Sequence, residues 1–379
     1  MKRMLMTATV PSMIGQFNMN NIKLLQKMGY EVDVACDFKD RSVWTEERIE
    51  KFIHQIEDLE IKYFQIDYSR SPLKIAKHIK AYRQLSRLFE ERQYNFVHCH
   101  TPVASIISRI VAHQKHVKCI YTAHGFHFYN GAPARNWIIF YPIEKFFSRW
   151  TDILITINKE DYKRAKDKFH AKKVVYIPGV GVDLDKFYPK DIVRYEIRKE
   201  LQIPESAFLL LSVGELSMRK NHQIVIKALG EIDNRNIYYA IAGQGHDKEE
   251  YEKLIIENHL EKNVFLLGMR TDIRELCLES DCFIHPSIRE GLGIAPLEAM
   301  ACGLPLISSY VNGIKDYTED GVTGCCINPY DCHNVLDAIV KMYSDFEFRE
   351  KCGKHNIEVV KQFDIKETQK IMEKLYLSI

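Results

Sequence analysis

The stretch HPSIREGLGIAPLEAMACGLPLISS, residues 285–309, contains the pattern that decides the fold. It predicts a buried strand that ends at His285, a glycine-containing loop, a helix that begins near Ile294, and a second buried strand over 304–308. A strand, a helix and a second strand in this order form a βαβ unit, whose two strands run parallel. The stretch therefore predicts a parallel sheet covered by helices.

The same alternation extends over most of the chain and predicts two doubly wound parallel sheets. A segment with proline and glycine at 177–191 interrupts it and predicts a connection between two domains. The predicted strands are 3–9, 31–36, 62–67, 96–99, 118–122, 153–157 and 174–177, then 208–213, 237–242, 264–267, 282–285 and 304–308. The predicted helices are 19–28, 73–92, 102–114, 136–149, 159–169, 223–232, 248–259, 272–278, 294–302, 334–343 and about 345–376.

Composition narrows the class of protein. A chain of 379 residues, 46% hydrophobic and 27% charged, is long enough for two cores, which excludes disordered and collagen-like architectures. The net charge of +2 gives no reason to expect nucleic acid as a partner, although residues 1–190 carry 31 basic and 20 acidic side chains. No run of eighteen apolar residues occurs, and the ten cysteines lack the framework of a small secreted protein. We expect a cytoplasmic protein.

Candidate ligand-binding residues lie in the loop and helix of the opening stretch. Glycines at a helix start let a ligand approach backbone N–H groups closely. Two carboxylates nearby, Glu290 and Glu298, can accept paired hydrogen bonds from the vicinal hydroxyls of a ribose or a hexose. The alternative is a tight turn followed by a helix with favourable N-terminal acids.

A second polar turn follows the predicted strand 208–213. Arg219 and Lys220 precede the next helix, where two cations and a helix N-terminus can neutralise a diphosphate. The same turn is also typical of a solvated basic loop. Gly243 and Gly245 follow another strand, but the third glycine of a dinucleotide fingerprint is missing.

In its context, the stretch 285–309 closely resembles the EX7E signature of the retaining GT-B glycosyltransferases, above all glycosyltransferase family 4. The resemblance extends along essentially the whole chain and is strongest over 209–325. It implies two Rossmann-like, doubly wound parallel-sheet domains that face a central cleft. These are an acceptor-binding domain at 1–188, a nucleotide-sugar-binding domain at 189–360, and a C-terminal helix at 361–379 that returns to the first domain.

The resemblance also implies an activity. A hexose or N-acetylhexosamine would pass from a nucleotide sugar, for which we choose UDP, to a hydroxyl of a sugar or a lipid-linked saccharide. The N-terminal region is similar to that of bacterial enzymes that assemble exopolysaccharide, capsule or lipopolysaccharide O-antigen units.

Roles for individual residues follow from the resemblance. In the family, the first glutamate contacts donor-sugar hydroxyls and the second contacts the ribose, which implies Glu290 and Glu298 here. Lys220 matches the family lysine on the diphosphate and, with Glu290, is a candidate catalytic residue. Glu215 stands where the family has arginine, so either Arg219 substitutes for that arginine or Glu215 meets the donor sugar. The other residues expected at the nucleotide sugar are Gly15, Gly243, Met269, Arg270, Gly291, Leu292, Gly293 and Ile294.

Histidines in the first half are candidates for the acceptor side. His124 matches the family histidine beside the donor sugar and the reacting centre, so we expect it to position the acceptor or to move a proton. Gln16, in a loop predicted over 10–17, and His100 and His127 are candidate acceptor-binding residues. A hydrogen-bonded core position is an equal interpretation of His100 and His127.

Two motifs suggest a metal. A His-Cys-His triplet ends at His100, but no second ligand pair with zinc spacing follows it. Asp183 and Asp185 mimic the DxD motif of the GT-A glycosyltransferases, but they lie in the predicted connection between domains. We expect no metal and no cofactor, because Lys220, helix N-termini and loop amides can carry the diphosphate charge.

The segment 71–93 predicts a basic amphipathic helix. Such helices most often pack one face on a sheet and solvate the other. In the basic first half, this helix is also a candidate for peripheral docking on anionic lipid at the inner face of the plasma membrane.

The sequence is compatible with other functions. An enzyme similar to UDP-N-acetylglucosamine 2-epimerase would keep the fold, but it needs a further set of carboxylates. A non-catalytic nucleotide-sugar binding protein would bind without turnover, and the presence of His124, Lys220, Glu290 and Glu298 argues against it. A dehydrogenase that uses NAD is disfavoured, because GxGxxG follows neither first strand.

Overall fold

The computed structural model describes residues 2–71, 73–189 and 196–379. The chain divides into two compact units, of which the first comprises Met1–Val180 with Thr368–Ile379 and the second comprises Gly181–Glu367. The division falls before the boundary at 188/189 that we expected. Residues 190 and 191 of the predicted connection lie outside the described part of the chain.

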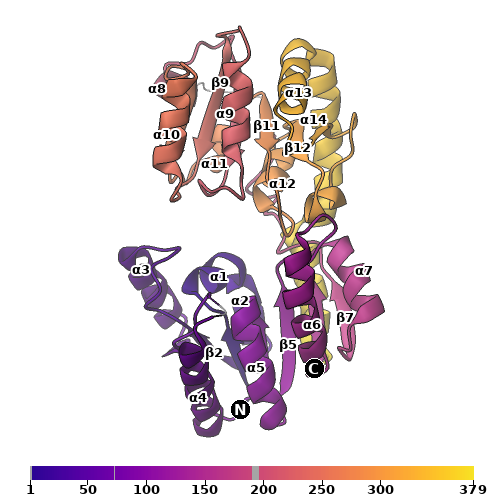
Figure 1. Cartoon of the computed structure of the whole chain (residues 1–379). Coiled ribbons are helices and arrows are strands. Elements are labelled where there is room, and N and C mark those ends of the chain that lie inside the picture. Colours follow the sequence, from indigo (N-terminus) through magenta and orange to yellow (C-terminus); the bar gives the residue numbers. More distant parts are fainter. Residues whose placement is uncertain (1, 72, 190–195) are drawn as a thin grey trace. The chain divides into compact units, whose positions relative to one another are not determined.

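The first unit is built on a seven-stranded parallel sheet with the order β3-β2-β1-β4-β5-β6-β7. Strands β2, β5 and β7 of this sheet are labelled in Figure 1. Strands inside the sheet, such as β6, are buried along their length because helices cover the sheet, whereas the edge strands β3 and β7 are partly exposed. The strands are β1 (Lys2–Thr7), β2 (Tyr30–Cys36), β3 (Lys62–Gln65), β4 (Phe96–His100), β5 (Lys118–Ala123), β6 (Ile153–Thr156) and β7 (Lys173–Tyr176).

Helices connect successive strands of this sheet. Four of them contribute side chains to one core, including Leu85, Ala104, Trp137 and Ala165 from α4, α5, α6 and α7 in turn. The C-terminal helix packs on the same sheet, because the Tyr376 ring stacks on a β4 ring and its hydroxyl bonds to a β4 histidine. The helices are α1 (Pro11–Phe17), α2 (Met19–Lys27), α3 (Glu46–Glu57), α4 (Ile75–Glu91), α5 (Pro102–Gln114), α6 (Ala134–Ser148), α7 (Lys159–Lys168) and α15 (Ile365–Leu377).

The second unit is built on a six-stranded parallel sheet with the order β10-β9-β8-β11-β12-β13. Its strands are β8 (Phe208–Val213), β9 (Ile237–Ala242), β10 (Val264–Gly268), β11 (Cys282–His285), β12 (Leu306–Ser309) and β13 (Gly324–Ile327). Its helices are α8 (Glu196–Glu200), α9 (His222–Gly230), α10 (Lys248–Glu257), α11 (Ile273–Glu279), α12 (Ile294–Ala301), α13 (Cys332–Ser344) and α14 (Phe346–Val360), with 3-10 turns η1 (Asn312–Asp316) and η2 (Lys361–Phe363).

The structure confirms the two parallel α/β sheets and corrects the prediction in a few places. Residues 10–17 were predicted as a loop, but α1 begins at Pro11, because proline at a first helical position costs no backbone hydrogen bond. The prediction lacked α3, α8, η1 and β13. The single helical pattern at about 345–376 is interrupted by η2 between α14 and α15.

Candidate functional site

In each unit the strand order reverses at one point, and in open parallel sheets ligands bind there, beyond the carboxyl ends of the strands. In the first unit this switch point lies between β1 and β4, and in the second between β8 and β11. The predicted residues Lys220 and Glu290 lie in the connections that leave β8 and β11. The topology thus brings together residues that are 70 positions apart in sequence.

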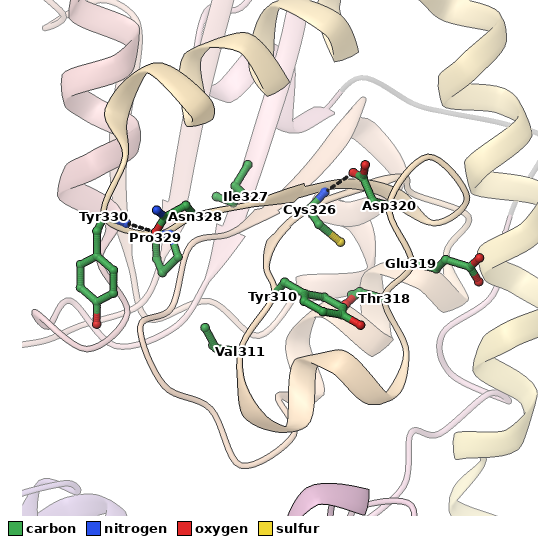
Figure 2. Close-up of a pocket in the computed structure, with 10 residues that line it drawn as sticks. All are labelled: Tyr310, Val311, Thr318, Glu319, Asp320, Cys326, Ile327, Asn328, Pro329 and Tyr330. Carbon is green, nitrogen blue, oxygen red and sulfur yellow. Dashed lines mark hydrogen bonds between the residues drawn. The ribbon is translucent and has the colours of Figure 1, made fainter. Parts of the chain in front are cut away.

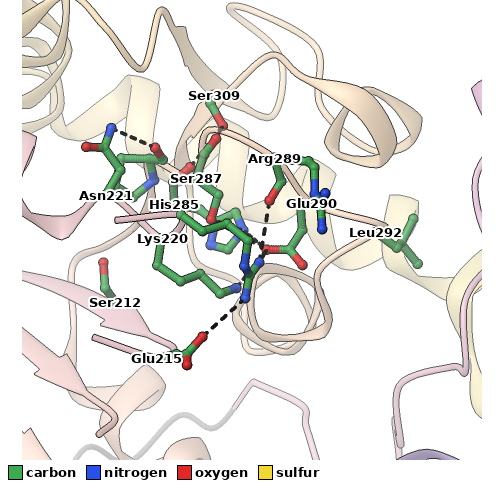
Figure 3. Close-up of polar contacts among 12 residues, drawn as sticks. Ser212, Glu215, Lys220, Asn221, His285, Ser287, Arg289, Glu290, Leu292 and Ser309 are labelled. Carbon is green, nitrogen blue, oxygen red and sulfur yellow. Dashed lines mark hydrogen bonds and ion pairs between the residues drawn. The ribbon is translucent and has the colours of Figure 1, made fainter. Parts of the chain in front are cut away.

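A compact ionic cluster occupies the switch point of the second unit (Figure 3). The Lys220 ammonium donates to Oε2 of Glu290 at 2.7 Å, and the Arg219 guanidinium donates to the same oxygen at 3.1 Å. The Lys220 and Glu290 side chains are only 11% and 14% exposed. Among the described residues, no hydrogen bond reaches Oε1 of Glu290, so this oxygen is available to accept from a ligand hydroxyl.

The charges of this cluster shift its pKa values. Burial alone would raise the pKa of Glu290, but the cations of Lys220 and Arg219 and the bond with His285 hold it well below the usual range. Burial, with a further contribution from Lys220, lowers the pKa of His285 to about 4. Glu290 is therefore a carboxylate, and His285 a neutral imidazole, at neutral pH.

The backbone after Glu290 forms a closely packed glycine-containing loop. Gly293, at the N-cap of α12, has φ +88°, and a Cβ there would crowd the Glu290 side chain. The loop is held in place by Gly313, where a Cβ would lie 1.9 Å from the carbonyl oxygen of Gly291. The Tyr317 hydroxyl donates to the carbonyl oxygen of Leu292 at 2.9 Å. Ile294 is the first residue of α12, as predicted.

Glu298 lies on α12, in the middle of the helix. Burial raises the pKa of its carboxyl to about 7, against an opposing effect from Lys186. A carboxyl with this pKa changes its charge near neutral pH.

Glu215, at the position of the family arginine, is half exposed and faces Arg219 at 3.7 Å. Arg219 also contacts Glu290, and Lys220 passes its aliphatic stem over Gly214, where a Cβ would lie 3.1 Å from Lys220 Cε. Lys220 and Arg219 therefore both reach Glu290 from one turn. They do so although Glu215, in the same turn, is acidic.

The glycines after β9 have a packing function. A Cβ on Gly243 would lie 1.8 Å from the carbonyl oxygen of Gly214, and one on Gly245 would lie 2.0 Å from that of Leu216. These glycines let the loop after β9 lie directly against the loop that leads to Lys220. That Gly243 also contacts the nucleotide sugar stays a prediction.

The predicted nucleobase segment follows β10. Met269 is exposed, and the Arg270 guanidinium is held by two carboxylates, Asp272 at 2.6 Å and Glu200 at 2.6 Å. Their hydrogen bonds raise the pKa of Arg270. That Arg270 contacts the base stays a prediction.

In the first unit, a row of hydrogen bonds connects His124 to the core. His100 is buried, and its Nε2 lies 3.2 Å from the sulfur of Met6 while its Nδ1 lies 3.0 Å from Nε2 of His124. A thioether sulfur only accepts, so we assign the His100 proton to Nε2, and His124 Nε2–H then donates to His100 Nδ1. Nδ1 of His124 is left as an acceptor. Burial lowers the pKa of His124 to about 4.

The other first-unit candidates lie on different elements. Gly15 is inside α1, and a Cβ there would lie 2.5 Å from a Trp44 ring carbon, so the glycine serves the packing of α1 on its neighbours. Gln16 is the next residue of α1. The His127 ring lies 4.6 Å from that of Phe140 in α6. Their contacts with donor or acceptor stay predictions.

The DxD-like aspartates have structural contacts. Asp183 Oδ1 accepts from the backbone N–H groups of Asp185 and Lys186, and Asp185 pairs with Lys366 at 2.8 Å. Within the described residues, no group of three His, Cys, Asp or Glu side chains is arranged to hold a metal ion.

An open pocket of about 940 Å³ lies at the carboxyl ends of β12 and β13 (Figure 2). None of the predicted site residues is among those that line it. The lining residues are Tyr310, Val311, Thr318, Glu319, Asp320, Cys326, Ile327, Asn328, Pro329 and Tyr330.

Sequence reasoning missed several residues that shape the two switch points. His285 lies 3.6 Å from Glu290, and the Ser287 hydroxyl lies 3.5 Å from it. In the first unit, Thr101 has φ +65°, rare for a β-branched residue, and its hydroxyl contacts that of Thr9 at 2.7 Å. Their positions at the ends of predicted strands, or within two residues of these ends, were the signal that could have identified them.

The sequence matches known families over both units. Residues 15–186 match the description Glycosyltransferase Family 4, and residues 193–359 match Glycosyl transferases group 1. The chain is 32% identical over 382 residues to the Bacillus subtilis (strain 168) protein named "Putative glycosyltransferase EpsD", with 99% of this chain and 96% of that protein covered. It is 28% identical over 316 residues, 81% of each protein, to the Escherichia coli UDP-Gal:alpha-D-GlcNAc-diphosphoundecaprenol alpha-1,3-galactosyltransferase.

Solved structures share the fold. Anabaena Alr3699/HepE in complex with UDP and glucose matches with a TM-score of 0.80 at 17% identity, with 100% of both chains covered. WaaG, a glycosyltransferase involved in lipopolysaccharide biosynthesis, matches with a TM-score of 0.74 at 18% identity over 99% of each chain. These matches, with the two parallel-sheet units, establish the GT-B fold. From its similarity to EpsD along nearly its whole length, this chain belongs to glycosyltransferase family 4.

Proposed function

We propose that this glycosyltransferase moves a hexose or an N-acetylhexosamine from a UDP-sugar to a hydroxyl of a saccharide or a lipid-linked saccharide, with retention of the anomeric configuration. Its product would serve the synthesis of a surface polysaccharide. The observation that carries the proposal is the convergence of Lys220 and Arg219 on Glu290 beside the N-terminus of α12. The Escherichia coli relative, named for a UDP-galactose donor and a diphosphoundecaprenol-linked acceptor, supports the choice of both substrates.

In this proposal the cations of the cluster bind the diphosphate of the donor, and its carboxylate binds the hydroxyls of the sugar. Lys220, Arg219 and the N–H groups of the loop after Glu290 take the diphosphate, where two cations and a helix N-terminus stabilise the charge that develops on the leaving UDP. Oε1 of Glu290 accepts from hydroxyls of the sugar, and Glu298 accepts from the ribose. The half-exposed Glu215 stays outside the diphosphate contacts, since Arg219 supplies the second cation.

The transfer step breaks the bond between the anomeric carbon and the phosphate oxygen and forms a bond to the acceptor oxygen on the same face of the sugar. The acceptor hydroxyl proton passes to the leaving phosphate. His124, with a pKa of about 4, is too weak a base to hold that proton at neutral pH. Its Nδ1 lone pair instead accepts a hydrogen bond from a sugar hydroxyl and orients it.

Product analysis tests the proposal. The purified protein is incubated with UDP-glucose, UDP-galactose or UDP-N-acetylglucosamine, with and without a diphospholipid-linked saccharide, and products are identified by mass spectrometry and their anomeric configuration by NMR. An acceptor-dependent α-linked product from one α-linked donor supports it. An epimerised sugar formed without acceptor, a β-linked product, or donor binding with no turnover of any tested donor and acceptor would overturn it.

A further inference from the structure

The helix α6 has its apolar face turned outward. Among its bulky apolar side chains, Ile138, Ile139 and Phe146 are 74%, 49% and 45% exposed, and Ile143 and Pro142 are also exposed. These five residues lie within one side of the helix, because their positions in an α-helix of 3.6 residues per turn span less than half of its circumference. We call this surface the α6 patch.

The opposite side of α6 anchors the helix to the first unit. Glu144 is buried, and its carboxylate pairs with Arg109 of α5 at 3.0 Å and lies 3.3 Å from the Tyr121 hydroxyl. Trp137 and Phe140 pack against the core of the first unit. α6 is therefore apolar on its inward and on its outward side, whereas the outward side of an ordinary surface helix is polar. Exposed apolar side chains on a firmly anchored helix mark an interaction surface.

Cations surround the α6 patch without acidic partners. Arg135 precedes the patch in the first turn, and Lys145 and Arg149 lie at its end, where the Arg149 guanidinium sits 4.6 Å from the Phe146 ring centroid. None of the three forms an ion pair with any residue that the structure describes. Residues 101–150 contain six basic residues and a single acidic one, the buried Glu144.

We propose that the α6 patch docks this protein on an anionic lipid bilayer. Apolar side chains ringed by Arg and Lys fit the boundary between acyl chains and anionic headgroups. A second copy of the chain fits less well, since a twofold contact would bring the same cations of both copies together without a carboxylate between them. Asn136 at the start of α6 donates to the carbonyl oxygen of His127, so the patch is tied to the loop predicted to bind the acceptor.

The patch is a better candidate than the helix 71–93 that the sequence suggested for docking. In that region the apolar side chains Leu85, Leu88 and Phe89 pack into the core, and only Leu73, Ile75 and Ile79 are exposed. On α4 Lys80 is paired with Asp67 at 2.5 Å, and Glu90 and Glu91 are exposed. This basic helix therefore offers fewer apolar side chains and carries acidic ones.

Vesicle flotation of the full chain tests the proposal. The membrane docking itself does not depend on the proposed function; only its link to a lipid-linked acceptor rests on that function. Vesicles of phosphatidylcholine alone are compared with vesicles that also contain phosphatidylglycerol, at low and high salt. The wild type should float with the anionic vesicles only, and less at high salt. The Ile138→Ser/Ile139→Ser variant and the Arg135→Gln/Arg149→Gln variant should each lower the partition coefficient about tenfold or more.

The matched control is the Leu73→Ser/Ile75→Ser variant at the start of α4, which should keep its binding within about twofold. Two measurements on every variant separate the outcomes: the melting temperature reports folding, and the melting shift with UDP reports the donor site. Flotation that persists in both α6 variants, or is lost equally in the α4 control, overturns the proposal. The proposal is also overturned if the wild type does not bind anionic vesicles. It is overturned as well if the wild type forms a dimer that dissociates in the α6 variants. A missing UDP shift in a protein that still floats would contradict the proposed function instead.

Discussion

Lys220 and Arg219 both donate to the same oxygen, Oε2, of Glu290, at 2.7 and 3.1 Å. The contact joins the connection after β8 to the loop after β11 across the switch point of the second sheet. Two cations share one carboxylate, so the turn keeps a net positive charge that can bind an anionic ligand. Oε1 of Glu290 can still accept a hydrogen bond.

The Lys220–Glu290 pair should show a measurable coupling in stability. Both side chains are mostly buried, so loss of either partner leaves an incompletely compensated charge. We expect Lys220→Met and Glu290→Gln each to be destabilising, with a coupling free energy of about 1–3 kcal/mol in a double-mutant cycle. Urea unfolding of the wild type, the two single variants and the double variant measures it. A coupling near zero would mean that the pair does not form in solution.

Glu290→Gln should separate binding from turnover. The amide keeps the shape of the side chain but loses the charge that orients the sugar, so kcat/KM for the UDP-sugar should fall about 100- to 1000-fold. The affinity for UDP itself should stay the same or rise, because a negative charge near the diphosphate is removed. Steady-state kinetics and UDP titration give the two values. If UDP affinity fell as steeply as turnover, Glu290 would be a structural residue.

A charge exchange tests which residue replaces the family arginine. Arg219→Ala should raise KM for the donor about tenfold, since a hydrogen bond to a charged group contributes about 1.5–3 kcal/mol. Adding Glu215→Arg to that variant should restore part of the affinity by placing a cation at the usual position. The control is Glu215→Gln alone, which should change KM by less than about threefold, because this side chain is half exposed. A large loss of donor affinity in Glu215→Gln would indicate that Glu215 itself contacts the donor.

Glu298 should make stability depend on pH. Burial raises the pKa of its carboxyl to about 7 in the folded chain, compared with about 4.5 when exposed. The protonated form therefore favours folding below about pH 4.5, and this contribution is lost as the pH rises to about 7. Relative to the wild type, Glu298→Gln should gain about 1–3 kcal/mol of stability between pH 5 and pH 8. Urea unfolding at several pH values measures this gain, and a difference that is constant with pH would refute the raised pKa.

His100 should act through His124. His100→Leu removes the acceptor of the His124 Nε2–H bond, so kcat/KM for the transfer should fall about tenfold or more while UDP affinity stays unchanged. His100→Asn, whose side-chain oxygen can take the place of Nδ1, should recover part of the activity. Melting temperatures of both variants control for a loss of folding. Equal activity of the Leu and Asn variants would leave His100 with a packing role only.

The sequence allowed both sheets to be predicted, because buried parallel strands are continuous apolar runs such as Phe208–Val213. The prediction missed β13, a four-residue Gly-Cys-Cys-Ile strand at the sheet edge whose length and composition give no periodic signal. It missed α1 because Pro11 and Gly15 in a short segment are typical of a loop, whereas here proline begins the helix and glycine admits Trp44.

Part of the candidate cluster could be identified from the sequence, but its connections could not. Lys220 and Glu290 were identified through a resemblance, yet their pairing depends on strand order, which a sequence of single elements does not reveal. Gly243 and Gly245 form only part of a dinucleotide fingerprint, and the sequence does not show that they also let their loop pack closely against a neighbouring loop. The outward apolar side of α6 was also hidden, since this helix carries apolar residues around most of its circumference and the sequence does not show which of them face the core.

Calorimetric titration with UDP, GDP, ADP and NAD tests most directly whether the Lys220–Arg219–Glu290 cluster is the donor site. The wild type should bind UDP selectively, and Lys220→Ala should weaken UDP binding about ten- to hundredfold, while Lys227→Ala, an exposed lysine on α9, should not change it. UDP binding of equal strength in the wild type and Lys220→Ala, or binding of NAD in place of UDP, would show that this cluster is not the donor site.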